Sequence, residues 1–452
     1  MRVAIIGAGY VGLTTGVALA HLDHTVVCVD KDPDKIEALR NGRCPIYEPG
    51  LQQLMLEDAA RLSFTSDTAS SVANADLIMI AVGTPAKQDG EANTCYVEAA
   101  AREVALGLRA EGSYVVVIKS TVPIGTNRRV ALVIERTLKE RNVHANVVLA
   151  SNPEFLREGM ALKDTFYPER IVVGAEDASA VEAVRRLYRP ILEQTFNPPS
   201  FLPRPEGYSL PPLITTDPTS AEMIKYASNA FLAVKISFAN EIAGLCDKVG
   251  ADVTEVTRGM GLDSRIGPQF LAAGLGWGGS CLPKDTAALI AVASQYNYSL
   301  PIVAAAREVN ARQRLLIVEK LQSVLRVLRG RMIGVLGLAF KPNTDDVRES
   351  PAIELVKLLV DRGAHVCVHD PAAIAKAQEA LCGVEVEYAK DPYEVAENAD
   401  AVVLATEWEA YRSLRLPELA RRMRSRYLVD ARNMYRRDEV EAAGLIYMGV
   451  GR

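Results

Sequence analysis

The sequence has no pair of cysteines in C-x-x-C spacing, although seven cysteines are scattered over its 452 residues. A dispersed, odd number of cysteines argues against a disulfide framework or a zinc site, so we expect no metal and a reducing compartment. Apolar runs of membrane-spanning length are also lacking, and the chain opens with "MRVAIIGAGY", a strand-and-turn pattern rather than a signal peptide. These absences predict a cytoplasmic protein that binds no membrane.

Strong charge of either sign is lacking as well. The formal net charge is -5 and no block of basic residues occurs, so a nucleic-acid-binding surface is not expected. Histidine is scarce: the five histidines lie outside every motif described below. We therefore do not expect an imidazole as the general base of any reaction.

The order of apolar segments predicts the fold class. The first part of the chain alternates continuous apolar runs, such as "VAIIGAG" and "ADLIMIAVG", with helix-like stretches, which is typical of a parallel sheet covered on both faces. A proline-rich stretch precedes one long, mostly buried helix, with Thr219 and Glu222 in capping-box spacing and Gly250 as its stop. A second α/β pattern starts near Arg331. We expect an α/β protein with two Rossmann-like doubly wound domains joined by a long central helix.

A glycine fingerprint follows the first expected strand. Gly7, Gly9 and Gly12 have G-x-G-x-x-G spacing between a strand and a helix, where they favour a tight turn and close approach of backbone to a pyrophosphate. Asp30 ends the next strand, where its carboxylate can accept hydrogen bonds from a ribose. That negative charge would repel a 2′-phosphate, which favours NAD over NADP, while the fingerprint alone leaves FAD open.

The stretch "GGSCLPKD" places Cys281 between glycines and a Lys-Asp pair. A free cysteine is often only a small buried hydrophobe. Here the ammonium of Lys284 and a helix N-terminus would lower the pKa of the thiol and populate a nucleophilic thiolate, and Asp285 is equally unsuited to a core. We interpret Cys281 as a nucleophile.

Two further motifs carry charged residues. Lys225 and Asn229 lie four residues apart in the long helix and share a face, although a lysine there could equally extend to the surface. "SNPEFLREG" follows a strand and presents Glu154 and Glu158, which could do acid–base work or simply solvate a helix start.

Together these motifs resemble those of the UDP-glucose/GDP-mannose dehydrogenase family, essentially from end to end. The resemblance extends to "GAGYVG", "KSTVPIGT", "GWGGSCLPKD" and "GLAFKPNTDDVRESPA", while "GLDSRIGPQFL" is similar to the UDP-glucose branch. It implies an enzyme that uses two NAD to oxidise UDP-glucose to UDP-glucuronate. It also implies a thiohemiacetal and a thioester on Cys281, because an aldehyde yields no second hydride until a nucleophile makes its carbon tetrahedral. GDP-mannose and UDP-N-acetylmannosamine are the alternative substrates.

The resemblance assigns residues by motif. The implied catalytic residues are Cys281, Lys225, Asn229, Asp285, Thr121, Glu154 and Glu158. The implied cofactor contacts are Gly7, Gly9, Val11, Gly12, Asp30, Lys35, Thr84, Thr121, Glu158, Lys284 and Arg348. The implied substrate contacts are Phe155, Leu156, Arg157, Glu158, Gly159, Lys225, Asn229, Phe270, Leu271, Ala272, Ala273, Gly274, Gly278 and Lys341, with Arg265 reaching the substrate of a partner subunit. Lys225 and Asn229 would stabilise an oxyanion and Asp285 would hold the water, although Lys225 is also a candidate base.

Three domains and an oligomer are implied. They are an NAD-binding Rossmann domain at 1–214, a central helical dimerisation domain with the catalytic Lys and Cys at 215–318, and a C-terminal UDP-sugar-binding Rossmann-like domain at 319–452. The long helix would build a homodimer or a higher homo-oligomer. Trp277 and Leu282 depart from the aromatic residues usual in the family and could alter the sugar fit; the stretch 195–213 is longer than usual, and we expect it to decorate the surface.

Two other classes of function fit less well. A two-electron β-hydroxyacid dehydrogenase needs neither a thiol nor a second α/β domain. A non-catalytic NAD-sensing protein would have no reason to keep Lys225, Asn229, Cys281 and Asp285 together.

Overall fold

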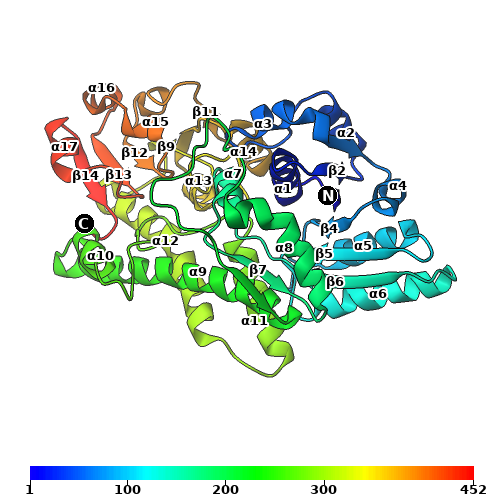
Figure 1. Ribbon diagram of the computed structural model, residues 1–452. Coiled ribbons are helices and arrows are strands. Elements are labelled where there is room, and N and C mark those ends of the chain that lie inside the picture. The colour runs from blue at the N-terminus through cyan, green and yellow to red at the C-terminus, as the bar shows by residue number, and fades with distance from the viewer. The chain divides into compact units, whose positions relative to one another are not determined.

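The chain forms two compact units in a computed structural model that describes all of residues 1–452. The first unit is Met1–Ala227 and the second is Ser228–Arg452. Each unit contains one sheet, and most helices and strands of both units are labelled in Figure 1. None of the helices is long and apolar enough to cross a membrane.

The sheet of the first unit has eight strands in the order β3-β2-β1-β4-β5-β6-β7-β8. Neighbouring strands are parallel except for β6 and β7. The strands are β1 (Arg2–Ile6), β2 (Thr25–Val29), β3 (Leu62–Thr65), β4 (Leu77–Ile80), β5 (Ser113–Ile118), β6 (Asn146–Ser151), β7 (Ile171–Gly174) and β8 (Leu213–Thr216). The helices are α1 (Tyr10–His21), α2 (Pro33–Arg40), α3 (Leu51–Glu57), α4 (Thr68–Ala73), α5 (Cys95–Gly107), α6 (Thr126–Glu140), α7 (Ala161–Phe166) and α8 (Ala178–Glu193).

Alternate residues of each strand serve two separate cores. Val3 and Ile5 of β1 pack into a cluster with α1, α3 and α8, whereas Ala4 and Ile6 pack into one with α5 and α6. Helices therefore cover both faces, and α5 and α6 lie side by side (Figure 1). Burial on both faces explains the continuous apolar runs of the sequence.

The second unit repeats the plan. Its six parallel strands are ordered β11-β10-β9-β12-β13-β14, so that the first strand in the chain lies inside the sheet, as it does in the Rossmann order. The strands are β9 (Met332–Leu336), β10 (His365–His369), β11 (Glu387–Tyr388), β12 (Ala401–Leu404), β13 (Tyr427–Asp430) and β14 (Ile446–Gly449). The helices that follow the long helix are α10 (Val253–Gly261), α11 (Leu282–Gln295), α12 (Pro301–Leu325), α13 (Pro351–Asp361), α14 (Ile374–Ala380), α15 (Glu409–Arg412), α16 (Leu416–Arg422) and α17 (Arg437–Ala442). The expected fold class is confirmed.

The long helix α9 (Pro218–Val249) crosses the boundary between the units, so Lys225 falls in the first and Asn229 in the second. Its stop is as expected, with Gly250 in the left-handed conformation at φ 75°. The capping box was wrong: Asp217 caps this end by accepting a hydrogen bond from the amide of Ser220 at 2.9 Å, and Glu222 binds elsewhere.

The expectation that α9 is mostly buried was also only partly right. Phe231, Phe238, Leu245 and Val249 leave between 46% and 67% of their surfaces exposed in the single chain. The first three repeat every seven residues and therefore share one face of the helix.

The proline-rich stretch between α8 and β8 packs onto the first unit. The ring of Phe196 stacks on Phe166 with their centroids 5.2 Å apart, and the Tyr208 hydroxyl donates to the carbonyl of Pro168 at 2.7 Å. The carbonyl of Asn197 lies 2.8 Å from Nε2 of His21. The stretch is thus anchored by side chains rather than loosely attached.

Candidate active site

The glycines of the loop after β1 allow close contacts between backbone segments at two positions. Gly7 adopts φ 104°, and a Cβ atom there would lie 2.7 Å from the carbonyl oxygen of Ala81. A Cβ on Gly12 would lie 1.8 Å from the carbonyl oxygen of Gly7. A Cβ on Gly9, in contrast, would meet no protein atom within 4 Å, so this position faces open space at the start of α1. This is the geometry in which a pyrophosphate can reach the amides of a helix N-terminus.

Asp30 lies beside that loop. Its carboxylate accepts hydrogen bonds from the amide of Ala8 at 2.9 Å and from the ammonium of Lys35 at 3.0 Å. Burial opposes ionisation of Asp30, but the amide of Asp32 together with these two donors outweighs it and lowers the pKa of the carboxyl group. Asp30 is therefore a fixed negative charge at the end of β2, which fits an unphosphorylated adenosine ribose.

The ends of β4, β5 and β6 bring further expected residues together. The hydroxyl of Thr84 donates to the carbonyl of Thr121 at 2.7 Å, and the hydroxyl of Thr121 lies 3.5 Å from the carboxylate of Glu154. Glu154 also accepts the amide of Leu156. Three expected residues from three strand ends thus converge, as parallel strands with a common carboxyl edge require.

Lys225 of α9 completes this cluster. Its Nζ lies 3.1 Å from Oε1 of Glu154, and both side chains are at most 5% exposed. Burial opposes ionisation of Glu154, but the attraction of Lys225, the amide of Leu156 and the charge of Lys119 together lower its pKa. The surface alternative for Lys225 is wrong, since the side chain is buried against a carboxylate and 5.3 Å from the ring centroid of Phe155.

The remainder of "NPEFLREG" is held by carboxylates. Arg157 forms an ion pair with Asp164 at 2.6 Å and leaves half its side chain exposed. The amide of Gly159 donates to Glu48 at 2.7 Å, and Glu48 also bonds the hydroxyl of Tyr10. Residues Phe155, Leu156 and Glu158 are half-buried in the same loop.

In the second unit Cys281 is the residue that precedes α11. One turn on, Asp285 is buried and receives two donors: the ammonium of Lys284 at 2.5 Å and the side-chain amide of Asn229 at 2.6 Å. The amide of Asp285 donates to the carbonyl of Cys281 at 2.8 Å. Four expected residues of the second unit, Asn229, Cys281, Lys284 and Asp285, are thereby linked.

Trp277 is buried and held by hydrogen bonds within the second unit. It is 6% exposed, and its indole nitrogen donates to the hydroxyl of Ser237 at 2.9 Å. The hydroxyl of Ser237 in turn donates to the carbonyl of Ala306 at 2.7 Å. The effect of this departure from the family on the sugar fit stays a prediction.

Other expected contacts lie on loops of the second unit. Arg348 is exposed and donates hydrogen bonds from Nε and Nη2 to the carboxylate of Asp346. The Nζ atom of Lys341 lies 5.8 Å from the ring centroid of Phe340. Arg265 is exposed and paired with Asp263 at 2.5 Å. Of the stretch Phe270–Gly274, Phe270 adopts φ 63° and Gly274 donates its amide to the side chain of Asn240 at 2.7 Å.

Three residues with clear roles in these clusters were missed by sequence reasoning. Glu222 accepts the amides of Gly125 and Asn127 at 2.6 and 2.8 Å and so ties α9 to the start of α6. Arg432 donates to the carbonyls of Ala405 at 2.8 Å and Gly276 at 3.0 Å. The third is Asn310, described below. Arg432 was detectable because it follows the end of β13, and the carboxyl ends of parallel strands are where such sheets bind ligands.

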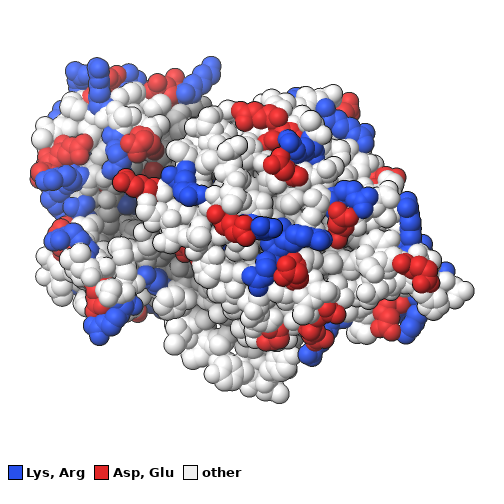
Figure 2. All heavy atoms as spheres, in the orientation of Figure 1, with Lys and Arg blue, Asp and Glu red and all other residues white.

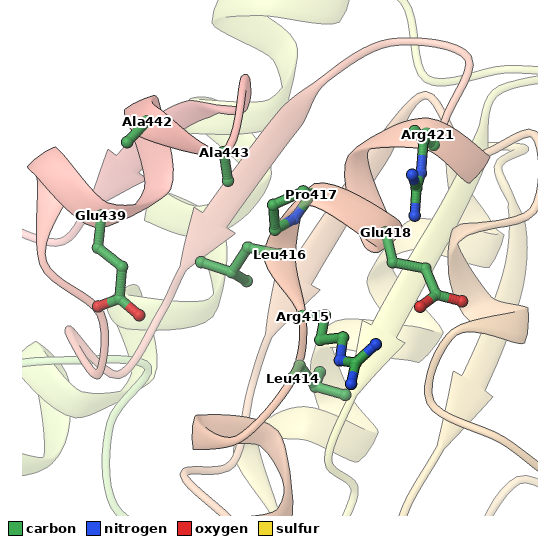
Figure 3. Close-up of a pocket in the computed structure, with 9 residues that line it drawn as sticks. All are labelled: Leu414, Arg415, Leu416, Pro417, Glu418, Arg421, Glu439, Ala442 and Ala443. Carbon is green, nitrogen blue, oxygen red and sulfur yellow. The ribbon is translucent and has the colours of Figure 1, made fainter.

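A surface pocket of about 430 Å³ lies elsewhere in the second unit. Figure 3 shows Glu439, Ala442 and Ala443 of α17 across from Leu416 and Pro417 of α16. None of the expected site residues lines it. On the face of the molecule in Figure 2, basic and acidic side chains are interspersed rather than gathered by sign.

The fold and the first cluster define a dinucleotide-binding α/β protein. Models of the UDP-glucose/GDP-mannose dehydrogenase family match the chain three times: the NAD binding domain over residues 1–192, the central domain over 219–312 and the UDP binding domain over 334–437. The chain is 48% identical to a UDP-glucose 6-dehydrogenase of Rhizobium meliloti, with all of both chains covered. It is 44% identical to the UDP-glucose 6-dehydrogenase TuaD of Bacillus subtilis, over 100% of this chain and 93% of the other.

A solved structure extends the similarity to three dimensions. A UDP-glucose dehydrogenase from the archaeon Pyrobaculum islandicum superposes with a TM-score of 0.87 at 41% identity, covering 99% of this chain and 97% of that one. The chain belongs to the UDP-glucose/GDP-mannose dehydrogenase family. The expectations of an NAD-dependent oxidoreductase and of a nucleotide-sugar substrate are confirmed.

Proposed function

We propose that this chain oxidises UDP-glucose to UDP-glucuronate in two NAD-dependent steps. The observation that carries the proposal is the 48% identity to a UDP-glucose 6-dehydrogenase over the full length of both chains. The side chains that this chemistry needs are present in two clusters: Thr121, Glu154 and Lys225 in the first unit, and Asn229, Cys281 and Asp285 in the second.

Bound NAD supplies the hydride acceptor, and the residues of the chain supply the rest. In the first step the C6 alcohol loses a proton and a hydride to become an aldehyde. The ammonium of the buried Lys225 lies 3.1 Å from Glu154, and its positive charge helps to lower the pKa of that carboxyl group. That charge suits stabilisation of a developing oxyanion better than removal of a proton. We therefore assign Lys225 to the oxyanion and not to the role of base.

Cys281 makes the second oxidation possible. Its sulfur adds to the aldehyde carbon, the carbonyl oxygen takes up the proton, and a tetrahedral thiohemiacetal results. Loss of the second hydride and of the hydroxyl proton leaves a thioester. Water then adds to the thioester, the C–S bond breaks, and the thiol and the carboxylate product are released. Asp285, placed one helical turn after Cys281 and held by Asn229 and Lys284, is assigned to orient that water.

An oligomer built on α9 is part of the proposal. The exposed face with Phe231, Phe238 and Leu245 would remain in water in a single chain, which is unfavourable for three large apolar side chains on one face of a helix. Arg265, exposed in the single chain, would then reach the substrate of the partner subunit. Light scattering of the wild type and of Phe238→Glu tests this, since a dimer that uses this face should dissociate in the variant, and a wild-type monomer would exclude it.

The compartment is proposed to be the cytoplasm. All seven cysteines are free thiols, and Cys95 and Cys382 are exposed to solvent. Exposed thiols remain reduced in a reducing compartment and oxidise outside it. Fractionation of cells that make the protein, with activity measured in each fraction, tests the location.

The substrate is tested by offering UDP-glucose, GDP-mannose and UDP-N-acetylmannosamine at equal concentrations with NAD. We expect rapid NADH formation with UDP-glucose and UDP-glucuronate as the product detected by mass spectrometry. Turnover of only one of the other two sugars would retain the chemistry and refute the substrate. Absence of turnover with all three would refute the proposed function.

A further inference from the structure

Several backbone groups of the segment 274–279, which leads into Cys281, form hydrogen bonds although the segment lies outside helices and strands. The amide of Gly274 binds Asn240, and the amide of Leu275 binds the carbonyl of Ala431 at 2.8 Å. The carbonyl of Gly276 accepts Arg432, and the amide of Gly279 donates to the carbonyl of Arg348 at 3.1 Å. All these partners belong to the same unit as Cys281.

Both backbone groups of Trp277, in the middle of this segment, are bound by a single side chain. Asn310 accepts the amide of Trp277 at 2.8 Å with Oδ1 and donates to its carbonyl at 2.9 Å with Nδ2. Asn310 is 5% exposed and lies in α12, a helix of 25 residues. The carbonyl of Asn310 also accepts Arg314, one turn further on.

The fit of Asn310 to the segment is close on a second side. Gly276 adopts φ 107°, and a Cβ atom there would lie 2.5 Å from Oδ1 of Asn310. No residue with a side chain can occupy this position without displacing the amide. Asn310 thus explains why residue 276 is a glycine. The position needs glycine both for its positive φ and because the side chain of Asn310 leaves no room for a Cβ atom.

We propose that Asn310 is a positioning residue for the nucleophile: by binding both backbone groups of Trp277 it holds the segment that carries Cys281 at the start of α11. The inference rests on the proposed function of Cys281. A side-chain amide is the group that matches one backbone donor and one backbone acceptor at once. An aspartate would present two acceptors, and its second oxygen would face the carbonyl of Trp277.

The inference predicts a selective kinetic defect. Asn310→Asp should leave the KM for NAD near the wild-type value, because Asn310 and Trp277 lie in the second unit and the glycine loop after β1 lies in the first. It should lower kcat by about 10- to 100-fold, the cost of displacing a reacting group by a fraction of an ångström or more. The second oxidation should suffer most, so NADH per UDP-glucose should fall from two toward one as the aldehyde escapes.

The test measures thiol reactivity as well as turnover. The rate of alkylation of Cys281 by iodoacetamide is followed by peptide mass spectrometry, with the exposed Cys382 of the same unit as the internal reference. We expect the ratio of the two rates to change in Asn310→Asp and to stay at the wild-type value in Gln322→Ala, which removes an exposed amide from the same helix. A folded Asn310→Asp protein with wild-type kcat, NADH ratio and alkylation ratio would overturn the inference.

A measurement on the wild type covers the case in which the variant does not fold. Hydrogen exchange at the amide of Trp277 should be as slow as exchange inside α12, because the amide is bound and buried. Exchange at the rate of an open loop would overturn the inference. If the wild type itself makes one NADH per UDP-glucose, the proposed role of Cys281 fails, whereas slow exchange at Trp277 would still establish the contact.

Discussion

Glu222→Gln should alter how the stability of the protein depends on pH. The carboxylate of Glu222 is 3% exposed and accepts the amides of Gly125 and Asn127. Burial raises its pKa from 4.5 to about 7, against the opposing effect of the two amides and of Arg128 and Arg129. Between these two pH values the folded protein therefore binds more protons than the unfolded chain.

The sign and size of the effect follow from this difference. A raised pKa in the folded state gives stability that is fully present below pH 4.5 and is lost as the pH rises through about 7. The shift from 4.5 to about 7 corresponds to about 3 kcal/mol of unfolding free energy, at 1.36 kcal/mol for each pKa unit. Glutamine does not titrate, so the variant lacks this loss.

Urea unfolding followed by far-UV circular dichroism, at a series of pH values across this window, measures the effect. Tryptophan fluorescence is unsuitable, because Trp277 and Trp408 both lie in the second unit while Glu222 lies in the first. The contributions of other titrating groups cancel when the unfolding free energy of the variant is subtracted from that of the wild type at each pH. A wild-type-minus-variant difference that stays constant across the window would refute the reasoning.

Four further variants test the catalytic and cofactor clusters. Lys225→Met should lower kcat by about 10²- to 10³-fold with NAD binding retained, because an oxyanion loses its main donor; wild-type kcat would exclude that role. Asp30→Asn should raise the KM for NAD by about 10- to 100-fold, which is the value of a hydrogen bond to a charged group. The variant should also prefer NAD over NADP less strongly than the wild type does. An unchanged ratio of kcat/KM for the two cofactors would contradict this. Gly9→Ala should have the wild-type melting temperature, because the added Cβ meets no protein atom. In calorimetry it should bind NAD at least about tenfold more weakly, because the Cβ would meet the pyrophosphate. In Gly12→Ala, by contrast, the Cβ meets Gly7, so a wild-type melting temperature there would refute the packing argument.

Local signals in the sequence predicted the fold and much of the candidate site. Asp30 was found because it ends the strand that follows the glycine fingerprint, whereas Thr84 and Thr121 were found through the resemblance of their motifs to the family. Asn229 and Asp285 were each found in a motif of their own. The hydrogen bond between their side chains was not predicted.

The residues that were missed act through partners distant in the chain. Glu222 looked like a cap of its own helix, since its spacing from Thr219 is correct, but its partners lie 95 and 97 residues earlier. Asn310 binds Trp277 across 33 residues and Arg432 binds Gly276 across 156. No local pattern encodes such pairings, because they depend on how separate helices and strands pack.

The central claim is that Cys281 allows the same enzyme to remove a second hydride. NADH formed per UDP-glucose consumed tests it most directly, measured for the wild type and for Cys281→Ser. We predict two NADH for the wild type. For Cys281→Ser we predict loss of steady-state turnover with NAD binding retained, because a serine alkoxide is far harder to generate at neutral pH than a thiolate. One NADH with an aldehyde product in the wild type, or normal turnover in Cys281→Ser, would contradict the claim.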